Sequence, residues 1–150
     1  MAHVRTQIRQ AVVAALAAGS TLAGANVADS RVSPWPAGIT AALSVHNGPE
    51  QSEPVTIGSP IAVMDRAFAL RVRAYVSDGD TAVAAQALDT LMAQVETLIA
   101  INCHAGGAQL IYPTGADFED EDSGDSTALR GYIDLQCRYT TSQLDPQQIR

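Results

Sequence analysis

Residues 117–125 contain six carboxylates, which form the densest group of titratable side chains in the chain. Carboxylate oxygens are the ligands that Ca²⁺ prefers. An EF-hand register with Gly124 at the glycine position would, however, place Arg130 where a bidentate glutamate is needed. We therefore expect no metal and no cofactor, and interpret the stretch as a solvated acidic loop or a contact surface for a basic partner. Its acids are Asp117, Glu119, Asp120, Glu121, Asp122 and Asp125.

Ser126 ends a short Gly-Asp-Ser block that resembles the nucleophile block of one class of lipases. A serine nucleophile needs a histidine base that the fold brings beside it. The histidines of this chain are His3, His46 and His104, and none follows Ser126 as the histidine does in those lipases. We expect that the chain is not an enzyme, and a small hydrolase is kept as an alternative.

All nine basic residues are arginines, and the absence of lysine excludes Schiff-base chemistry and a Walker-type phosphate loop. Sixteen acidic residues give a formal net charge of −7, which repels a polyanion. Arg71 and Arg73 share one face of an expected strand, where a planar guanidinium can pair with a neighbour's carboxylate. We expect these two arginines and the six acids to be assembly contacts, and we expect no specific binding of DNA.

Two amphipathic helices are expected to cover the core. Over residues 3–18 apolar side chains recur every four positions, and Gly19 follows as a C-cap. A second helix is expected to begin after Asp80, a typical N-cap, and to end near Asn102. The two expected buried stripes are Val4, Ile8, Val12 and Leu16, and then Val83, Ala87, Leu88, Leu91, Val95, Leu98 and Ile99.

Alternation of apolar and polar residues predicts the strands. In the strongest of them Leu70 and Val72 point to one face, while Arg71 and Arg73 point to the other. Runs of strands with short turns favour an α+β fold, with an antiparallel or mixed β-sheet covered by two amphipathic helices in a single domain, 1–150. No apolar stretch is long enough to cross a membrane. The expected strands are 27–32, 39–46, 67–76, 109–112 and 129–139.

The order of these elements resembles that of phage tail terminator and tail-completion proteins, the group that includes the minor tail protein U. The resemblance lies in the opening helix 4–16, the segment 29–34 with its Asp-Ser-Arg-Val-Ser-Pro sequence, the arginine-bearing strand 71–76 and the closing strand that ends at Tyr139. It covers most of the chain.

The resemblance implies a structural virion protein without catalytic residues. Such a protein forms a homo-oligomer, a hexameric ring, that caps the head-proximal end of the tail tube, stops tube polymerisation and joins tail to head. Its partners would be the tail tube protein and a head-tail connector or neck protein, and DNA would only pass through the ring. It would be assembled in the host cytoplasm. Another head-tail joining protein, of the neck or head-completion kind, is the alternative.

Overall fold

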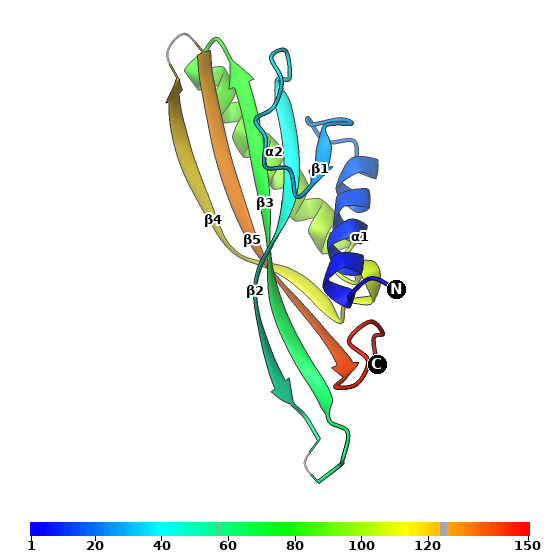
Figure 1. Cartoon of the computed structure of the whole chain (residues 1–150). Helices are drawn as coiled ribbons and strands as arrows, with labels where there is room; N and C mark the ends of the chain where they lie inside the picture. The colour runs from blue at the N-terminus through cyan, green and yellow to red at the C-terminus, as the bar shows by residue number, and fades with distance from the viewer. Residues whose placement is uncertain (57, 124–125) are drawn as a thin grey trace.

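The computed structural model describes residues 1–56, 58–123 and 126–150, without the side chains of residues 120–123 and 126–127. Two helices cover one face of a five-stranded sheet with the order β1-β2-β3-β5-β4 (Figure 1). All neighbouring strands are antiparallel except β1 and β2, so the sheet is mixed and the expected α+β fold is confirmed. The elements are α1 (Val4–Ala18), β1 (Val27–Asp29), β2 (Ala41–Pro54), β3 (Val63–Asp78), α2 (Thr81–Ile101), a 3₁₀ turn (Ala105–Gly107), β4 (Leu110–Ser123) and β5 (Ser126–Ser142).

Both helices begin where the sequence predicts, because each has a side chain that accepts a free backbone N–H of the first turn. His3 Nδ1 accepts from the Arg5 N–H at 3.2 Å, and Asp80 Oδ1 accepts from the Ala82 N–H at 2.9 Å. In α1 the four expected stripe positions are fully buried. None of the helices in the described part of the chain is long and apolar enough to cross a membrane.

Helix α2 buries Leu88, Leu91, Val95 and Ile99 as expected, but its first turn differs from the prediction. Val83 is 49% exposed, while Ala84 and Met92 are buried. In the sheet, Gly131 has no side chain and Met92 Sδ lies 2.4 Å from the place that a Cβ would take. Met92 fills the space above Gly131, and Ala84 rather than Val83 lies on the same buried side of the helix.

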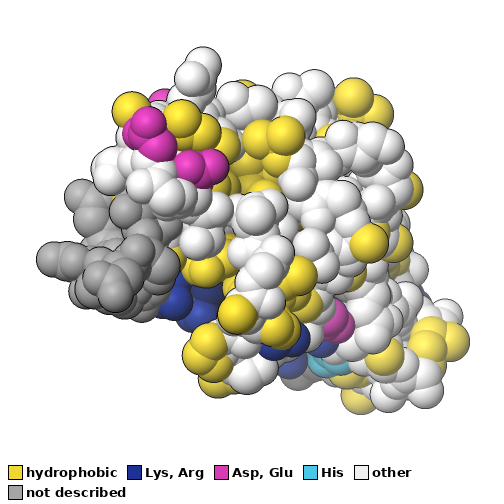
Figure 2. All heavy atoms as spheres, turned by 90° about the horizontal axis from the view of Figure 1, so that it is seen from above, with side chains coloured by type: hydrophobic (Ala, Val, Ile, Leu, Met, Phe, Trp, Pro, Cys, Tyr) yellow, Lys and Arg dark blue, Asp and Glu magenta, His cyan; other side chains and the backbone are white. Residues whose placement is uncertain are grey.

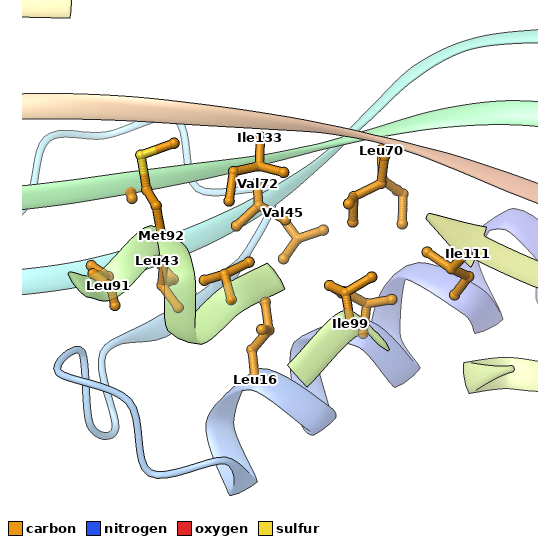
Figure 3. Packing of buried hydrophobic residues seen from close by; sticks show 14 of the residues in the cluster. Leu16, Leu43, Val45, Leu70, Val72, Leu91, Met92, Ile99, Ile111 and Ile133 are labelled. Carbon is orange, nitrogen blue, oxygen red and sulfur yellow. The ribbon is translucent and has the colours of Figure 1, made fainter. Parts of the chain in front are cut away.

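The core lies between the helices and the sheet (Figure 3). Leu16 of α1 and Leu91 of α2 point toward Leu43, Leu70 and other side chains of the sheet, and all four are fully buried. Each such side chain contributes about 1.5–3 kcal/mol by leaving water. Helix α2 packs across β3 and β5, whereas α1 packs beside β1 and β2, so the two helices together close one face.

A polar cluster fixes the start of α1 against the sheet. The Glu50 carboxylate of β2 accepts a hydrogen bond from the Tyr139 hydroxyl at 2.6 Å and one from Arg66 Nη1 at 3.0 Å. Arg5 of α1 lies 3.5 Å from the same carboxylate. Because the Glu50 side chain is only 10% exposed, these donors replace the water that its charge loses on folding. Burial, followed by the hydrogen bond to Glu50, raises the pKa of Tyr139.

Strand β2 continues past the expected stop. The sequence predicted an end near Asn47, before a glycine and a proline, but β2 runs to Pro54. The register with β3 shifts between Asn47 and Glu50, so Gly48 and Pro49 lie in a β-bulge. A proline is tolerated there because β1 pairs only with residues 43–45, which leaves this part of β2 as an edge without a partner for the missing N–H.

The expected acidic loop 117–125 is wrong, because β4 extends through Ser123 and its residues 117–123 pair with β5. Mutual repulsion of carboxylates, about 1 kcal/mol per close pair in water, was the reason to expect a loop. A strand sends successive side chains to opposite faces, which separates adjacent acids, and it places Glu119 opposite Arg130. Asp125 lies outside the described residues, as do the side chains of Asp120, Glu121 and Asp122.

Replacement of Leu70 or Leu91 by alanine is expected to lower the free energy of unfolding by about 2–5 kcal/mol, because both side chains are fully buried and would leave a cavity. Val83→Ala on the exposed side of α2 is the control, and its expected loss is below about 0.5 kcal/mol. Urea denaturation of the three variants measures the effect. Equal losses at Leu91 and Val83 would contradict the observed orientation of α2.

Candidate interaction surface

The face of the sheet turned away from the helices, here called the open face, carries the candidate contact residues Arg71 and Arg73. Alternation along β3 puts Leu70 and Val72 into the core and therefore Arg71 and Arg73 onto the open face, as the sequence predicted. The register places Asp134 of β5 beside Arg71 and Tyr132 of β5 beside Arg73.

Arg71 has a carboxylate partner within its own chain. Its Nε lies 2.7 Å from Asp134 Oδ1 and its Nη2 lies 3.1 Å from Asp134 Oδ2, a bidentate pair. The hydrogen bond from Arg71 holds the pKa of Asp134 below its ordinary value and raises the pKa of Arg71 itself. A neighbouring molecule would therefore have to share Arg71 with Asp134.

Tyr132 lies on the open face and is nevertheless buried. The Arg71 guanidinium carbon lies 5.2 Å from the centre of its ring, and that of Arg73 lies 6.0 Å away. Its hydroxyl donates to Glu119 Oε2 at 2.8 Å, which connects β5 to the acidic end of β4. Burial, followed by this hydrogen bond, raises the pKa of Tyr132. The Tyr132 ring therefore contacts the guanidinium groups of both Arg71 and Arg73.

The segment between β1 and β2 folds over the upper part of the open face. Arg31 lies with its guanidinium carbon 4.5 Å from the Trp35 ring centre and donates to the backbone carbonyls of Ser33 and Pro34 at 3.1 and 2.8 Å. Between this segment and the sheet lies a hollow of about 210 Å³. We call it the arginine recess and define it by the lining residues Arg31, Trp35, Arg73, Arg130 and Tyr132. Figure 2 shows arginine side chains gathered beside hydrophobic ones on one side of the molecule.

The sequence pointed to Arg73 but missed Arg31, Trp35 and Arg130 as members of one site. These residues come from the β1–β2 segment, β3 and β5, and no spacing in the chain brings them together. The one local signal is the separation of four residues between Arg31 and Trp35, beside prolines that stop a strand.

A second hollow, of about 280 Å³, adjoins the recess and is lined in part by His46, Arg71, Arg73 and Asp134. At its edge the buried Ser44 hydroxyl lies 2.5 Å from His46 Nε2. Burial lowers the pKa of His46. Among the contacts of the described residues, no carboxylate accepts from the other ring nitrogen of His46, so the pair lacks the third group that orients a catalytic histidine. The side chain of Ser126, the serine considered from the sequence, lies outside the described residues.

Within the described residues no three His, Cys, Asp or Glu side chains are gathered as a metal site would require. That search does not include the side chains of Asp120, Glu121 and Asp122, or Asp125, so the absence of a metal stays a prediction.

No protein-family model matches the chain, and no curated protein sequence matches it. Among solved structures, it is similar to a chain in a structure described as the virion of a native gene transfer agent particle. The two are 20% identical, with a TM-score of 0.50, and the match covers 93% of this chain and 92% of the other. The likeness shows that the two chains share a fold over nearly their whole lengths.

The Arg71–Asp134 pair is expected to contribute only about 0.2–1 kcal/mol to stability, because its side chains are 44% and 37% exposed. A double-mutant cycle with Arg71→Gln and Asp134→Asn, read by urea denaturation, measures the coupling free energy. Because the folded-state pKa of Asp134 is depressed, this contribution is present above the carboxyl's unfolded-state pKa, about 4, and is lost as pH falls through its folded-state pKa. A coupling above about 2 kcal/mol would contradict a solvent-screened pair.

Removal of metal ions is expected to leave the melting temperature unchanged, because the acid spacing around Gly124 does not fit a calcium loop. Thermal unfolding with EDTA, and again with added Ca²⁺, is the measurement. A fall of several degrees in EDTA that Ca²⁺ reverses would show that the acidic stretch binds the ion.

Proposed function

We propose that this chain is a structural virion protein of the phage type. More specifically, it is a tail terminator: a ring subunit that caps the head-proximal end of the tail tube, stops tube polymerisation and joins tail to head. The observation that carries the proposal is the fold likeness to a chain of a gene transfer agent virion, which spans 93% of this chain. The resemblance of its element order to tail terminators is independent support, because it came from the sequence alone.

The shape of the subunit suits a ring. Figure 1 shows two hairpins at opposite ends of the sheet: β2–β3, which projects at one end, and β4–β5, which ends beside β3 at the other. The first carries exposed apolar side chains near its tip, Val55 and Ile61, and the second carries acids. Contacts between copies that use two different patches are heterologous, and such contacts close into rings when the rotation between neighbours allows it.

The partners follow from this assignment. Further copies of the chain form the ring, a hexamer, and its two sides contact the tail tube protein and a head-tail connector or neck protein. DNA passes through the ring without specific binding, since a net charge of −7 repels a polyanion. The protein would be found in the virion, at the head-proximal end of the tail, after assembly in the host cytoplasm.

The oligomer is tested by mass photometry of the purified protein. The expected particle has six times the subunit mass of 15.7 kDa. Because a ring that forms only on the tube would escape this test, the same sample is then mixed with purified tail tubes and imaged by electron microscopy. A single ring at one end of each tube is the expected result. Monomers in solution together with bare tubes would overturn the proposal.

The acidic end of β4 is expected to act in assembly rather than in folding. Replacement of Asp120, Glu121 and Asp122 by serine should leave the melting temperature within a few degrees of wild type but weaken the joint to the tube or neck. Complementation of a terminator-deficient phage should then yield overlong or headless tails. Tails of uniform length on normal particles, from protein expressed at the wild-type level, would remove this stretch from the assembly contacts.

A matched control removes the same charge elsewhere. Glu53, Asp89 and Glu96 are exposed and have no ion-pair partner among the described residues. Their joint replacement by serine also removes three negative charges. Normal particles from this variant would show that position, and not net charge, decides assembly.

Two other functions are separated by simple observations. A neck or head-completion protein would lie on the head side of the joint, so that its loss gives tails of normal length that fail to attach. A small hydrolase would use the Ser44–His46 pair, the one Ser–His hydrogen bond among the described residues, or Ser126. Hydrolysis of a nitrophenyl ester that is lost in Ser44→Ala or Ser126→Ala would favour that reading, and we expect no hydrolysis at all.

A further inference from the structure

We infer that the arginine recess binds a tetrahedral dianion of the phosphate type, either free phosphate or the phosphate group at the end of a larger molecule. The recess is formed within one subunit, so the inference goes beyond the proposed ring and does not depend on it. It concerns Arg31 of the β1–β2 segment and Arg73 of β3, which approach the same hollow from two elements.

Two guanidinium groups of the recess have no acid partner. Within the described residues neither Arg31 nor Arg73 forms an ion pair, and the contact of Arg73 there is with the Tyr132 ring. Arg130 lines the same hollow and already interacts within the chain. Beside it the Glu119 carboxylate accepts from the Tyr132 hydroxyl. The charges of Arg31 and Arg73 are therefore the two that a ligand can compensate.

Two like charges at one hollow repel each other unless an anion lies between them. Arg31 is half-buried and Arg73 is exposed, so water solvates only part of this charge. A phosphate group carries nearly two negative charges at neutral pH, which matches the two guanidinium groups. Its binding would replace the repulsion by two attractions, each with charge-assisted hydrogen bonds.

The Arg31 side chain is held in place before a ligand arrives. Its Nε and Nη2 donate to the carbonyls of Ser33 and Pro34 at 3.1 and 2.8 Å, and its guanidinium carbon lies over the Trp35 ring. Among the hydrogen bonds of the described residues none uses its Nη1, which can donate to a ligand. A side chain that is already ordered loses little conformational freedom on binding.

The directions of the donors favour a tetrahedral ion over a carboxylate. A carboxylate has two oxygens in one plane, and the fork of a single guanidinium can satisfy both. The recess instead has polar groups on separate walls: Arg31 from the β1–β2 segment, Arg73 from β3 and the buried Ser44 hydroxyl from β2. When His46 Nε2 donates to Ser44 Oγ, the hydroxyl hydrogen is left for the recess. Four oxygens around one phosphorus can meet donors on several walls.

The size of the recess and the charge of the chain select a small anion. The volume of about 210 Å³ lies below the ~300–1,000 Å³ of pockets that hold drug-sized molecules, so an ion fits and a nucleotide does not. The segment around Arg31 and Trp35 covers one side, which leaves room for an end group rather than for the middle of a DNA strand. A net charge of −7 also repels a polyanion far more than it repels a small dianion.

Trp35 is the only tryptophan of the chain, so its fluorescence reports on the recess directly. Inorganic phosphate, titrated at neutral pH and constant low ionic strength, is expected to change this emission with a Kd on the order of 1 mM, a weak affinity because the exposed charge of Arg73 is screened. Arg73→Gln and Arg31→Gln should each raise the Kd about tenfold or more, because each removes a charge-assisted contact. Arg150→Gln removes the same charge beside Thr140, at the other end of β5, and should bind phosphate as wild type does.

A series of small anions separates charge, shape and source. Acetate, chloride and dimethyl phosphate, a diester with one charge, should each bind about tenfold more weakly than inorganic phosphate at equal ionic strength, because none is a dianion. Methyl phosphate tests the source of the ligand. Binding as strong as that of inorganic phosphate would support the end group of a larger molecule, and binding of inorganic phosphate alone would support the free ion.

Arg73→Gln is the deciding variant, because Arg31→Gln also loses the hydrogen bonds to Ser33 and Pro34. Circular dichroism and the melting temperature without phosphate show whether each variant is folded. The inference would be overturned by wild type in which phosphate changes neither the emission nor the NMR shift of the Trp35 indole N–H. Acetate that binds as well as phosphate, or an unchanged Kd in folded Arg73→Gln, would overturn it too. Ring formation is measured without phosphate, so a failure here leaves the proposed function untouched.

Discussion

The packing of α1 and α2 against one face of the sheet is the interaction on which the rest of the structure depends. Leu16 and Leu91 from the helices and Leu43 and Leu70 from the strands are fully buried between the two layers. Because side chains alternate along a strand, burial of one face fixes what the other displays. The arginines of β3 lie on the open face for the same reason that Leu70 lies in the core.

The sheet is longer than the helices that cover it, and the β2–β3 hairpin projects beyond them (Figure 1). Toward this end of the sheet polar contacts join the strands: Glu50 accepts from Arg66 and Tyr139 beside the start of α1, and Arg138 pairs with Asp65 at 2.7 Å. These groups join three paired strands, β2, β3 and β5, where the sheet has little apolar surface to bury. A subunit with such an extension has a surface well separated from its own core, as contact with neighbours in an assembly requires.

The acidic end of β4 shows how electrostatics and strand pairing compete. Repulsion between neighbouring carboxylates favours an open loop, but backbone ladder bonds to β5 and the Tyr132–Glu119 hydrogen bond favour a strand, in which Glu119 lies opposite Arg130. Strand pairing is the stronger effect, so the acidic segment continues β4 through Ser123. The arginine recess gathers three guanidinium groups on a chain that is acidic overall.

The sequence by itself determined the helices, the α+β class and the identity of the two faces of β3. The stripe from Val4 to Leu16, the Asp80 cap and the alternation around Arg71 are local patterns with a period of a few residues, and a local pattern can be read without knowing the fold. The sequence also predicted part of the candidate surface, namely the arginines of β3 and the acids from residue 117 onward.

Only the tertiary structure decided the rest, because it depends on residues far apart in the chain. Gly131 leaves space for Met92 of α2, β4 pairs with β5 through its acidic residues, and Asp134 forms an ion pair with Arg71. The recess brings Arg31 and Arg130 to Arg73 across a distance of many residues in sequence. Strand register and close packing bring these distant residues into contact, and neither leaves a periodic signal in the amino-acid sequence.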